Sequence, residues 1–413
     1  MEQEEKEFTA LDYLFAGSYL PEKAQSFSME NVGDYTGMVA DDAAEGFGMM
    51  RYQNGSFYEG FWHKGDFCGK GRFHCCYQSR QDEPEFYDYE GEFEKNNRNG
   101  FGRCVFSDGE RYVGFWRDDV IDGMGVYEVP GKYIYTGEFR DDVICGHGQL
   151  RCSNGDTYIG DFENDLMHGV GKFISADGWY YIGNFRFGCR DGIGKLVFPD
   201  GEMYEGEFRD DEQSGFGKAV YPDGETYVGD FLNGVFHGFG VYRCANGAYY
   251  EGQFQDGLRC GTGKYVFSNG SYYEGAFRDG VSHGKGKEVL SDGTVYEGGF
   301  QNDRRHGEGK LRLPDGEYYE GGFRNGERHG QGRTVYPDGC IYEGSYRNGM
   351  RQGSGKLIFP DGSYYLGFFR KGVLNDCGVL YDAEGNIIEM GEWRNGELIS
   401  GFEERRNDLL SAP

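Results

Sequence analysis

A tyrosine followed by Xaa-Gly-Xaa-aromatic recurs every 23 residues through most of this 413-residue chain. Thirteen copies run from Tyr89 to Tyr365 without a change of spacing, and two more begin at Tyr35 and Tyr58. The 31 residues between Tyr58 and Tyr89 equal one repeat plus an insertion of eight residues. A regular repeat of this length predicts an array in which each unit packs only against its neighbours.

Glycine holds three positions of the repeat. With the tyrosine as position 0, positions 2 and 13 are glycine in all fifteen copies, and position 11 is glycine in all but the last, which has Asp376. These positions account for 44 of the 73 glycines. At position 2 the missing Cβ leaves room for an aromatic ring to lie flat against the backbone. The glycines are therefore predicted to be architectural, because a phosphate-binding loop would not recur through an array.

Alternation of residue types predicts β-strands. In the segment 204–208 the aromatic residues and the glycine share one face, and the segment 215–221 alternates as well. Asn-Gly at positions 6 and 7, as in 233–234, and Asp-Gly at positions 19 and 20, as in 223–224, favour positive φ in tight hairpin turns. The chain is therefore predicted to be all-β: an elongated, single-layer antiparallel meander of about fifteen hairpins, with short helical or irregular tails at both ends. In two representative copies the predicted core residues are Tyr204, Gly206, Phe208, Gly215, Gly217, Tyr227, Gly229, Phe231, Gly238 and Gly240.

The chain divides into an array, residues 35–401, and two tails, 1–34 and 402–413. Apolar residues at helical spacing in the acidic N-terminal tail predict a cap on the first strand edge. The segment 389–393, one residue out of phase, is predicted to be a terminal half-repeat. The insertion predicts a loop near 77–88 that is either neutral or a binding site. Its candidate partner-binding residues are Arg80, Asp82, Glu83 and Phe86.

Charge restricts the partners that this chain can bind. The 70 acidic and 42 basic residues give a net charge of −28, which repels nucleic acids and anionic membrane surfaces. The N-terminus lacks the features of a signal peptide, and no apolar run of 18 residues occurs. Eleven cysteines in such a chain fit a reducing compartment. These observations predict a cytoplasmic protein that does not bind nucleic acid.

No catalytic, cofactor or metal site is predicted. Carboxylates recur at position 1 and histidines at position 10, but equivalent residues of adjacent repeats would lie two strands, about 10 Å, apart. Ligands must approach a zinc or calcium ion to about 2.1–2.5 Å, so we interpret the carboxylates as a solvated polar face. The cluster His74-Cys75-Cys76 lacks a second pair at zinc-finger spacing.

The combination Tyr-Glu-Gly-Xaa-Phe, Asn-Gly, His-Gly-Xaa-Gly and Asp-Gly is complete in 319–339 and nearly complete in 227–247. This pattern resembles the MORN (membrane occupation and recognition nexus) repeat, and the resemblance covers about residues 35–401. It implies a non-catalytic, elongated sheet. Such arrays occur in cytoskeletal scaffolds, in radial-spoke and other ciliary proteins, in junctional membrane proteins, and as accessory modules of some enzymes. The chain lacks a kinase glycine-rich loop, so it is most similar in build to the cytoskeletal and ciliary members.

We therefore predict a structural scaffold or spacer, not an enzyme, that binds protein partners in a cytoskeletal or axonemal, radial-spoke-like assembly of a cilium or flagellum. A phospholipid-binding, membrane-tethering module is the alternative, and an enzyme-regulating subunit is a third interpretation. Charge disfavours lipid binding, because basic residues such as Arg304, Arg305 and Arg328 are interleaved with acidic ones. The open sheet ends also predict a homodimer through a terminal repeat, unless the last copy closes its end.

Overall fold

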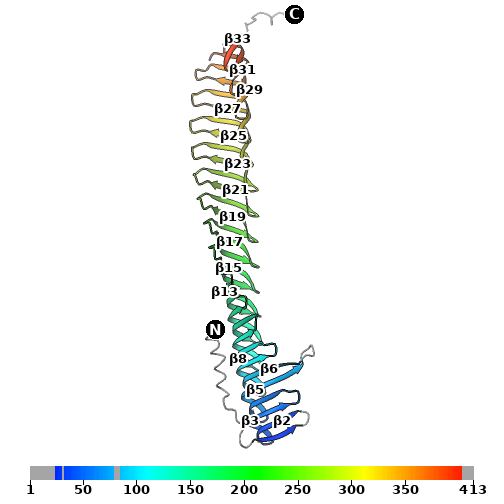
Figure 1. The fold of residues 1–413 in the computed structure, drawn as a ribbon. Coiled ribbons are helices and arrows are strands. Elements are labelled where there is room, and N and C mark those ends of the chain that lie inside the picture. The colour runs from blue at the N-terminus through cyan, green and yellow to red at the C-terminus, as the bar shows by residue number, and fades with distance from the viewer. Residues whose placement is uncertain (1–23, 30–31, 79–83, 402–413) are drawn as a thin grey trace, which may run out of the picture. The chain divides into compact units, whose positions relative to one another are not determined.

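The structure, a computed structural model, describes residues 24–29, 32–78 and 84–401, and these residues form 33 β-strands and no helix. The chain divides into two compact units near residue 200. One comprises Met1–Pro199 and Phe208–Asp211, and the other comprises Asp200–Glu207 and Glu212–Pro413. Within each unit, consecutive strands pair antiparallel in chain order (Figure 1). The predicted all-β meander is thus confirmed. The predicted helical cap and the segment 402–413 lie outside the described residues.

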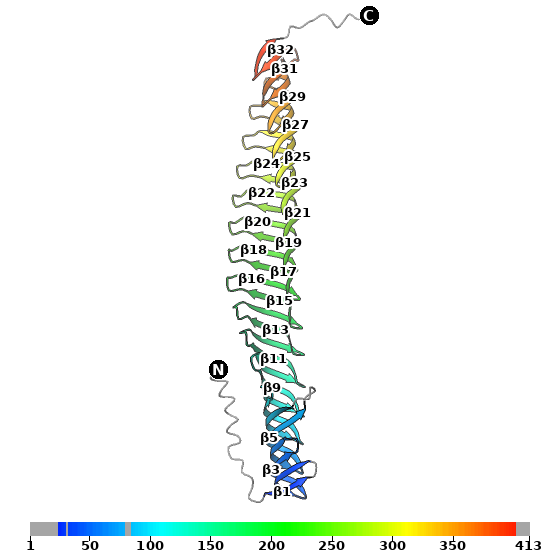
Figure 2. The ribbon, with the colours of Figure 1, turned by 45° about the vertical axis from the view of Figure 1, so that its right-hand side comes forward.

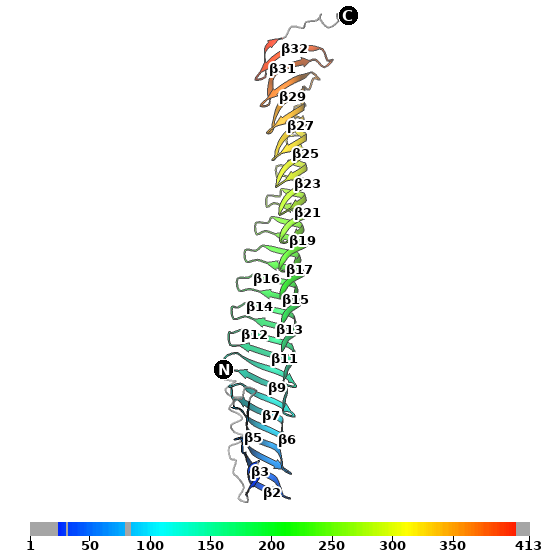
Figure 3. The ribbon, with the colours of Figure 1, turned by 90° about the vertical axis from the view of Figure 1, so that its right-hand side faces the viewer.

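The first unit contains strands β1 to β15 (Figure 3). Their bounds are β1 Gln25–Met29, β2 Gly33–Ala40, β3 Ala43–Tyr52, β4 Phe57–His63, β5 Asp66–Gln78, β6 Pro84–Glu94, β7 Asn97–Phe106, β8 Arg111–Arg117, β9 Val120–Val129, β10 Tyr133–Arg140, β11 Val143–Cys152, β12 Thr157–Glu163, β13 Leu166–Ile174, β14 Tyr180–Arg186 and β15 Cys189–Val197. The division between the units falls within β16, Met203–Arg209.

The second unit contains strands β17 to β33 (Figure 2). Their bounds are β17 Glu212–Val220, β18 Thr226–Leu232, β19 Val235–Arg243, β20 Tyr249–Gln255, β21 Leu258–Val266, β22 Tyr272–Arg278, β23 Val281–Val289, β24 Val295–Gln301, β25 Arg304–Arg312, β26 Tyr318–Arg324, β27 Glu327–Val335, β28 Ile341–Arg347, β29 Met350–Ile358, β30 Tyr364–Arg370, β31 Val373–Tyr381, β32 Ile387–Arg394 and β33 Glu397–Gly401.

In each repeat the tyrosine ring lies over a pair of glycines. In the repeat of Tyr227, Gly229 and Gly240 are cross-strand partners. A Cβ on Gly240 would come within 2.4 Å of the tyrosine oxygen, and a Cβ on Gly229 within 2.4 Å of the Gly240 Cα. Positions 2 and 13 are therefore both glycine because the ring occupies the space that their side chains would need.

The tyrosine hydroxyl is fixed by the backbone. The register of the hairpins shifts just after the position-2 glycine, where a β-bulge interrupts the ladder. All fifteen position-0 hydroxyls donate to the carbonyl oxygen of position 3, at 2.8–3.4 Å. Burial raises the pKa of Tyr319 to about 12, so this hydroxyl keeps its proton at neutral pH. Each such bond contributes about 1 kcal/mol.

The aromatic residue at position 4 joins adjacent repeats. The ring of Phe162 packs edge-on against Tyr158 of its own repeat and Tyr135 of the preceding one, with both centroid distances 5.1 Å. Edge-to-face pairs of this kind stabilise by about 0.5–1.5 kcal/mol beyond their burial. Since the same contact recurs along each unit, the core is continuous although a single hairpin is only one layer thick.

The two hairpin turns differ in geometry. At positions 6 and 7, Asn233 and Gly234 both have left-handed φ, 51° and 77°, as their sequence predicts. At positions 19 and 20, only the glycine does: Gly224 has a φ of 88° and donates to the carbonyl of Tyr221. This is a type I turn followed by a left-handed glycine. The prediction of positive φ is therefore wrong for the aspartate of Asp-Gly, whose side chain instead accepts the amide of Glu225.

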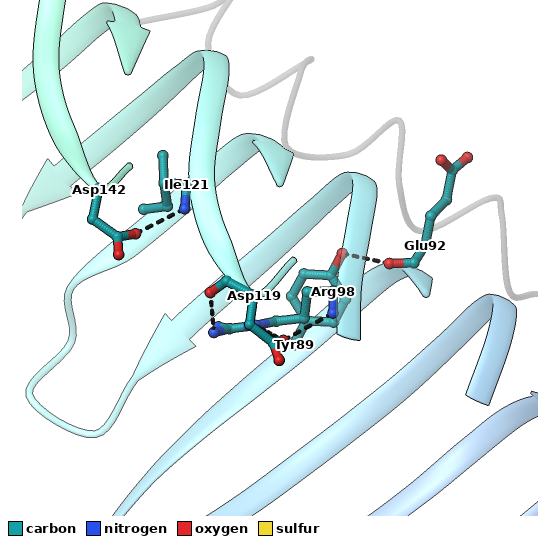
Figure 4. Close-up of polar contacts among 6 residues, drawn as sticks. All are labelled: Tyr89, Glu92, Arg98, Asp119, Ile121 and Asp142. Carbon is teal, nitrogen blue, oxygen red and sulfur yellow. Dashed lines mark hydrogen bonds and ion pairs between the residues drawn. The ribbon is translucent and has the colours of Figure 1, made fainter. Parts of the chain in front are cut away.

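Seven turns carry an acidic or amide side chain instead of glycine at position 7: one is Asp42 in the first repeat, with a φ of 61°, and the other six follow a preceding repeat. The φ values of these six are 62–72°, and each side-chain Oδ1 accepts the backbone N–H of position 9 in the preceding repeat at 2.7–2.9 Å (Figure 4). The backbone cost of the left-handed conformation is thus offset by a hydrogen bond between repeats. These residues are Asn96, Asp119, Asp142, Asp165, Asp211 and Asp303.

The position-7 contact predicts an unusual order of substitutions at Asp142. Asp142→Ala removes the acceptor of the Ile121 amide and keeps the unfavourable φ of 67°, so we expect a loss of about 2 kcal/mol. Asp142→Gly removes the acceptor alone and should cost about half as much. Amide hydrogen exchange of residues 120–145 measures both. Equal losses in the two variants would contradict this account.

Strands begin at Gln25, within the segment assigned to the N-terminal tail. Strand β1 pairs with β2 along its whole length, and the Phe27 ring lies 5.0 Å from that of Tyr35. The edge of β2 is therefore covered by an added strand. The first repeat has Val39 in place of an aromatic residue at position 4, and Phe27 of β1 supplies an aromatic contact to Tyr35 of this repeat.

The insertion lengthens one hairpin. Strands β5 and β6 have 13 and 11 residues, whereas β13 and β14 have nine and seven. Four additional cross-strand pairs extend the ladder from Cys75↔Tyr87 to Gln78↔Pro84. The predicted loop near 77–88 is corrected accordingly: its residues continue the antiparallel pairing, and only residues 79–83 lie outside the described part.

Candidate functional site

The residue at position 9 covers the tyrosine ring on the aromatic face, by which we mean the sheet face that carries the tyrosines. Phe236 stacks on Tyr227 with a centroid distance of 3.9 Å. In six repeats this residue is an arginine whose guanidinium lies 4.8–5.9 Å from the centroid of the tyrosine ring, a cation–π contact. These arginines are Arg98, Arg190, Arg259, Arg305, Arg328 and Arg351.

The arginines also bind the next turn or a nearby carboxylate. Arg98 donates through Nη2 to the carbonyl of Asp119 at 2.7 Å and through Nε to its carboxylate at 3.1 Å (Figure 4). Arg328 pairs with Glu317 at 2.5 Å, and both side chains are 16% exposed. The sequence shows that position 9 is arginine in these repeats. It does not show that the arginine covers the tyrosine ring in the way that Phe236 does in another repeat.

A hollow opens on the aromatic face of each unit. One, in the first unit, has a volume of about 250 Å³ and is walled mainly by apolar side chains, among them Leu150, Cys152 and Phe173. The other, in the second unit, has a volume of about 390 Å³. It is lined by Tyr221, Pro222, Asp223, Glu225, Phe236 and Tyr242, and it therefore combines aromatic rings with carboxylates.

The structure places the predicted aromatic core residues in the packed layer of rings on the aromatic face, and the predicted glycines in the strands beneath these rings. Tyr204 and Tyr227 are buried, and so are Phe208 and Phe231. The ring of Phe231 packs edge-on against both tyrosines at 5.0 Å. Of the glycines, Gly206 and Gly229 lie against Gly217 and Gly240, and Gly215 and Gly238 have left-handed φ of 57° and 56°.

The opposite sheet face, here the outer face, is apolar over much of the first unit. Phe61 and Phe115 are 49% and 48% exposed and pack edge-on against Phe47 and Phe101, with centroid distances of 5.6 Å in both pairs. Exposed apolar side chains on this face are Met38, Phe61, Phe101, Phe115, Met124, Ile159, Val170, Ile182 and Ile193. Sequence reasoning missed this surface, although its signal is present as apolar residues at positions 1, 3 and 12, where other repeats have charged ones.

The outer face of the second unit carries cross-strand ion pairs. Each joins a basic residue at position 14 to the position-1 glutamate of the next repeat, at 2.8–3.3 Å. The hydrogen bond between Lys287 and Glu297 raises the pKa of the lysine and lowers the pKa of the glutamate. The four pairs are Lys264–Glu274, Lys287–Glu297, Lys310–Glu320 and Arg333–Glu343.

A shallow groove of about 630 Å³ runs between these charges. Its lining includes Gly275, Gly286, Gly298 and Gly309, whose backbone forms the floor because side chains at these positions would point to the aromatic face. Ion pairs such as Lys287–Glu297 line its sides. Four of the position-1 glutamates, interpreted from sequence as a solvated polar face, are thus exposed but paired with cations.

Of the candidate residues in the insertion, Arg80, Asp82 and Glu83 lie outside the described residues. Phe86 is 39% exposed on β6, and its ring lies 5.4 Å from that of His74. The ring of Phe57 stacks on the same imidazole, also at 5.4 Å. The structure therefore brings Phe86 into contact with the histidine of the Cys/His cluster.

That cluster forms a hydrogen-bonded chain across the lengthened hairpin. His74 Nδ1 lies 2.9 Å from the Asp88 carboxylate, and its Nε2 lies 3.2 Å from the Cys76 sulfur. A thiol, an imidazole and a carboxylate in this order can share a proton. Because aromatic rings from both neighbouring strands pack against the imidazole, we assign the hydrogen-bonded series of Cys76, His74 and Asp88 a structural role in the longer hairpin.

Within residues 24–29, 32–78 and 84–401, no group of three or more His, Cys, Asp or Glu side chains is placed to hold a metal ion. The same residues contain no helix with the length and apolar character needed to cross a bilayer.

Comparison with protein families gives fourteen matches to the model of the MORN repeat. They span residues 35–57, 58–76, 89–111, 112–130, 135–157, 158–180, 181–203, 204–226, 227–249, 250–272, 273–295, 296–318, 319–341 and 342–364. The copy that begins at Tyr365 lies beyond these matches, although its hydroxyl makes the same bond, to the Phe368 carbonyl at 3.4 Å. A search of curated proteins found no match.

Similar solved structures share low identity with this chain. One is the TCP domain of SAS-4 (dCPAP) from Drosophila melanogaster in complex with a proline rich motif of Ana2 (dSTIL), at 13% identity and a TM-score of 0.24, covering 48% of this chain and 88% of that one. Another is the G-box domain of the microcephaly protein CPAP, at 12% identity and a TM-score of 0.16, covering 60% and 93%. A streptogramin B lyase matches at 11% identity and a TM-score of 0.12, covering 76% and 95%.

Proposed function

Because this chain belongs to the MORN-repeat family, we propose that it is a non-enzymatic scaffold that binds protein partners in a cytoskeletal or axonemal assembly. Repeats of this family form scaffolds and modules that bind proteins or membranes. One observation favours proteins here: the outer face of the first unit exposes aromatic, methionine and aliphatic side chains over many strands. Contiguous exposed apolar surface marks an interaction site, and aromatic residues and methionine are enriched at protein interfaces.

The distribution of cations supports protein partners over a lipid surface. A reader of anionic headgroups needs several basic side chains free on one patch. In the second unit four basic residues at position 14 are paired with glutamates, and Arg305 and Arg328 are paired with Glu288 and Glu317 at 2.6 and 2.5 Å. The net charge of −28 adds long-range repulsion.

Proximity labelling in cells tests this proposal. We expect the wild-type chain to label cytoskeletal or axonemal proteins of the cytoplasm, cilium or flagellum. The double variant Phe101→Ser/Phe115→Ser should lose about tenfold of the labelling of a direct partner, because aromatic anchors in an interface contribute about 2 kcal/mol or more. Both residues are exposed, so the fold should be retained.

The matched control is Val235→Ser with Leu258→Ser, which removes apolar side chains of similar exposure from the first positions of β19 and β21 in the second unit. This control should keep the wild-type labelling. Co-sedimentation with vesicles that contain phosphatidylserine and phosphatidylinositol bisphosphate examines the lipid alternative. Strong, salt-sensitive binding to these vesicles would overturn the proposal in favour of a membrane-tethering module. The homodimer through a terminal repeat stays a prediction.

A further inference from the structure

The hollow on the aromatic face of the second unit contains a carboxylate that has no ion-pair partner in the described part of the chain. Glu225 is half-buried at the end of the turn between β17 and β18, and it accepts a hydrogen bond from the hydroxyl of Tyr242 on β19. No ion pair among the described residues includes Glu225. The position-9 residue of this repeat is Phe236, which stacks on Tyr227 and leaves about 390 Å³ open beside it.

Other repeats of the same unit show what this corner accepts. Glu225 holds the same repeat position as Glu317, and the partner of Glu317 is the position-9 arginine, Arg328, at 2.5 Å. The glutamate at this repeat position therefore does bind a guanidinium in another copy, four repeats further along the chain.

The two tyrosine walls have equivalents that contact arginine as well. Tyr242 is at position 15, as is Tyr265, whose ring lies 4.8 Å from the guanidinium of Arg259. Tyr221 is at position 17, as is Tyr336, whose ring lies 5.7 Å from the guanidinium of Arg351. The hollow thus combines, in one repeat, three groups that elsewhere each contact an arginine of the chain itself, and here the arginine is replaced by phenylalanine.

We propose that this hollow binds an arginine side chain of a partner protein, with the guanidinium between Tyr221 and Tyr242 and in contact with Glu225. Aromatic faces attract cations, and a carboxylate at the same place adds a charge-assisted hydrogen bond to the planar guanidinium. The exposed Asp223 at the rim and the acidic charge of the chain favour a basic segment as the source of that arginine. The inference rests on the proposed role as a scaffold for proteins, and it names the chemistry of one contact.

Fluorine NMR of the full chain tests the site directly. 4-Fluorophenylalanine at residue 236 alone gives one resonance that reports the hollow, and the probe is N-acetyl-arginine amide. We expect a saturable shift with this probe and none with N-acetyl-citrulline amide, which has the same shape without the charge. Glu225→Gln in the labelled chain should weaken the binding by about tenfold. An absent shift, an equal shift with citrulline or an unchanged affinity in Glu225→Gln would overturn the site.

A second measurement uses a variant in which a side chain of the protein itself supplies the guanidinium to the hollow. Phe236→Arg places an arginine at position 9, where six repeats already have one, so the variant should fold as the wild type does. If the corner accepts a guanidinium, Glu225→Gln will lower the thermal stability of the Phe236→Arg chain and leave that of the wild type nearly unchanged. Equal effects in both backgrounds would count against the site. Failure of both measurements while protein neighbours are still labelled in cells would remove the arginine site and leave the scaffold proposal intact.

Discussion

Substitution of Gly240 by alanine is expected to destabilise the hairpin of β18 and β19 by about 3 kcal/mol, the upper range for forcing atoms into a filled core. The new Cβ would lie 2.4 Å from the oxygen and 2.5 Å from ring carbons of Tyr227. The ring has little freedom to move, because Phe231 packs on its edge at 5.0 Å and Phe236 on its face at 3.9 Å. Amide hydrogen exchange of residues 226–243 in the full chain measures the loss.

Gly234→Ala in the turn of the same hairpin is the matched control. Nothing lies within 4 Å of the Cβ that it would add, and only its φ of 77° is unfavourable, so the loss should be about 1 kcal/mol. Tyr227→Phe should not rescue Gly240→Ala, because the ring carbons at 2.5 Å remain. A Gly240→Ala chain with the exchange rates of the control would show that the glycine pair does not depend on the ring.

The sequence predicts the fold because one pattern repeats in every copy. A tyrosine, three glycines and two turns recur at fixed spacing, and each has a local cause: a ring over paired glycines, a bulge with left-handed φ, and a tight turn. Where Asp376 replaces glycine at position 11, it takes the same left-handed φ, 59°. The strand β1 escaped prediction because Gln25–Met29 lacks the motif and is held by pairing with β2.

The candidate surfaces were harder to predict because they depend on pairs of residues in different repeats. Asp142 fixes the amide of Ile121, 21 positions earlier, and Lys287 pairs with Glu297 across two strands. A search for the invariant positions passes over these contacts, since the residues vary between copies. The hollow beside Phe236 arises in the same way, from a substitution in one repeat. The surfaces proposed for binding therefore depend on residues that vary between the repeats, not on the invariant positions.

At the other end of the chain, Trp393→Ala is expected to remove about 3–5 kcal/mol from the last hairpins, the usual cost of deleting a buried large aromatic side chain. The segment 389–393 is one residue out of phase, and the pairing of β31 with β32 shifts between Leu380 and Tyr381 to absorb that residue. Gly391 then pairs with Gly378, which brings Trp393 onto the aromatic face. There its ring packs edge-on against Tyr365 at 5.4 Å and its Nε1 donates to the Gly378 carbonyl at 3.3 Å.

Without the indole, the ring of Tyr365 loses its cover toward β32, so amides of β30 and β31 should exchange much faster. Trp393→Phe should retain most of the protection, because phenylalanine fills position 4 in most repeats. Ile388→Ala on the same strand is the control: this side chain is 54% exposed, so its loss should change stability by less than about 0.5 kcal/mol. Protection of β30 and β31 that survives Trp393→Ala would mean that another group closes this end. Loss of protection would instead show that Trp393 in the out-of-phase half-repeat covers Tyr365, the last position-0 tyrosine of the array, and that the hairpins before it depend on this ring.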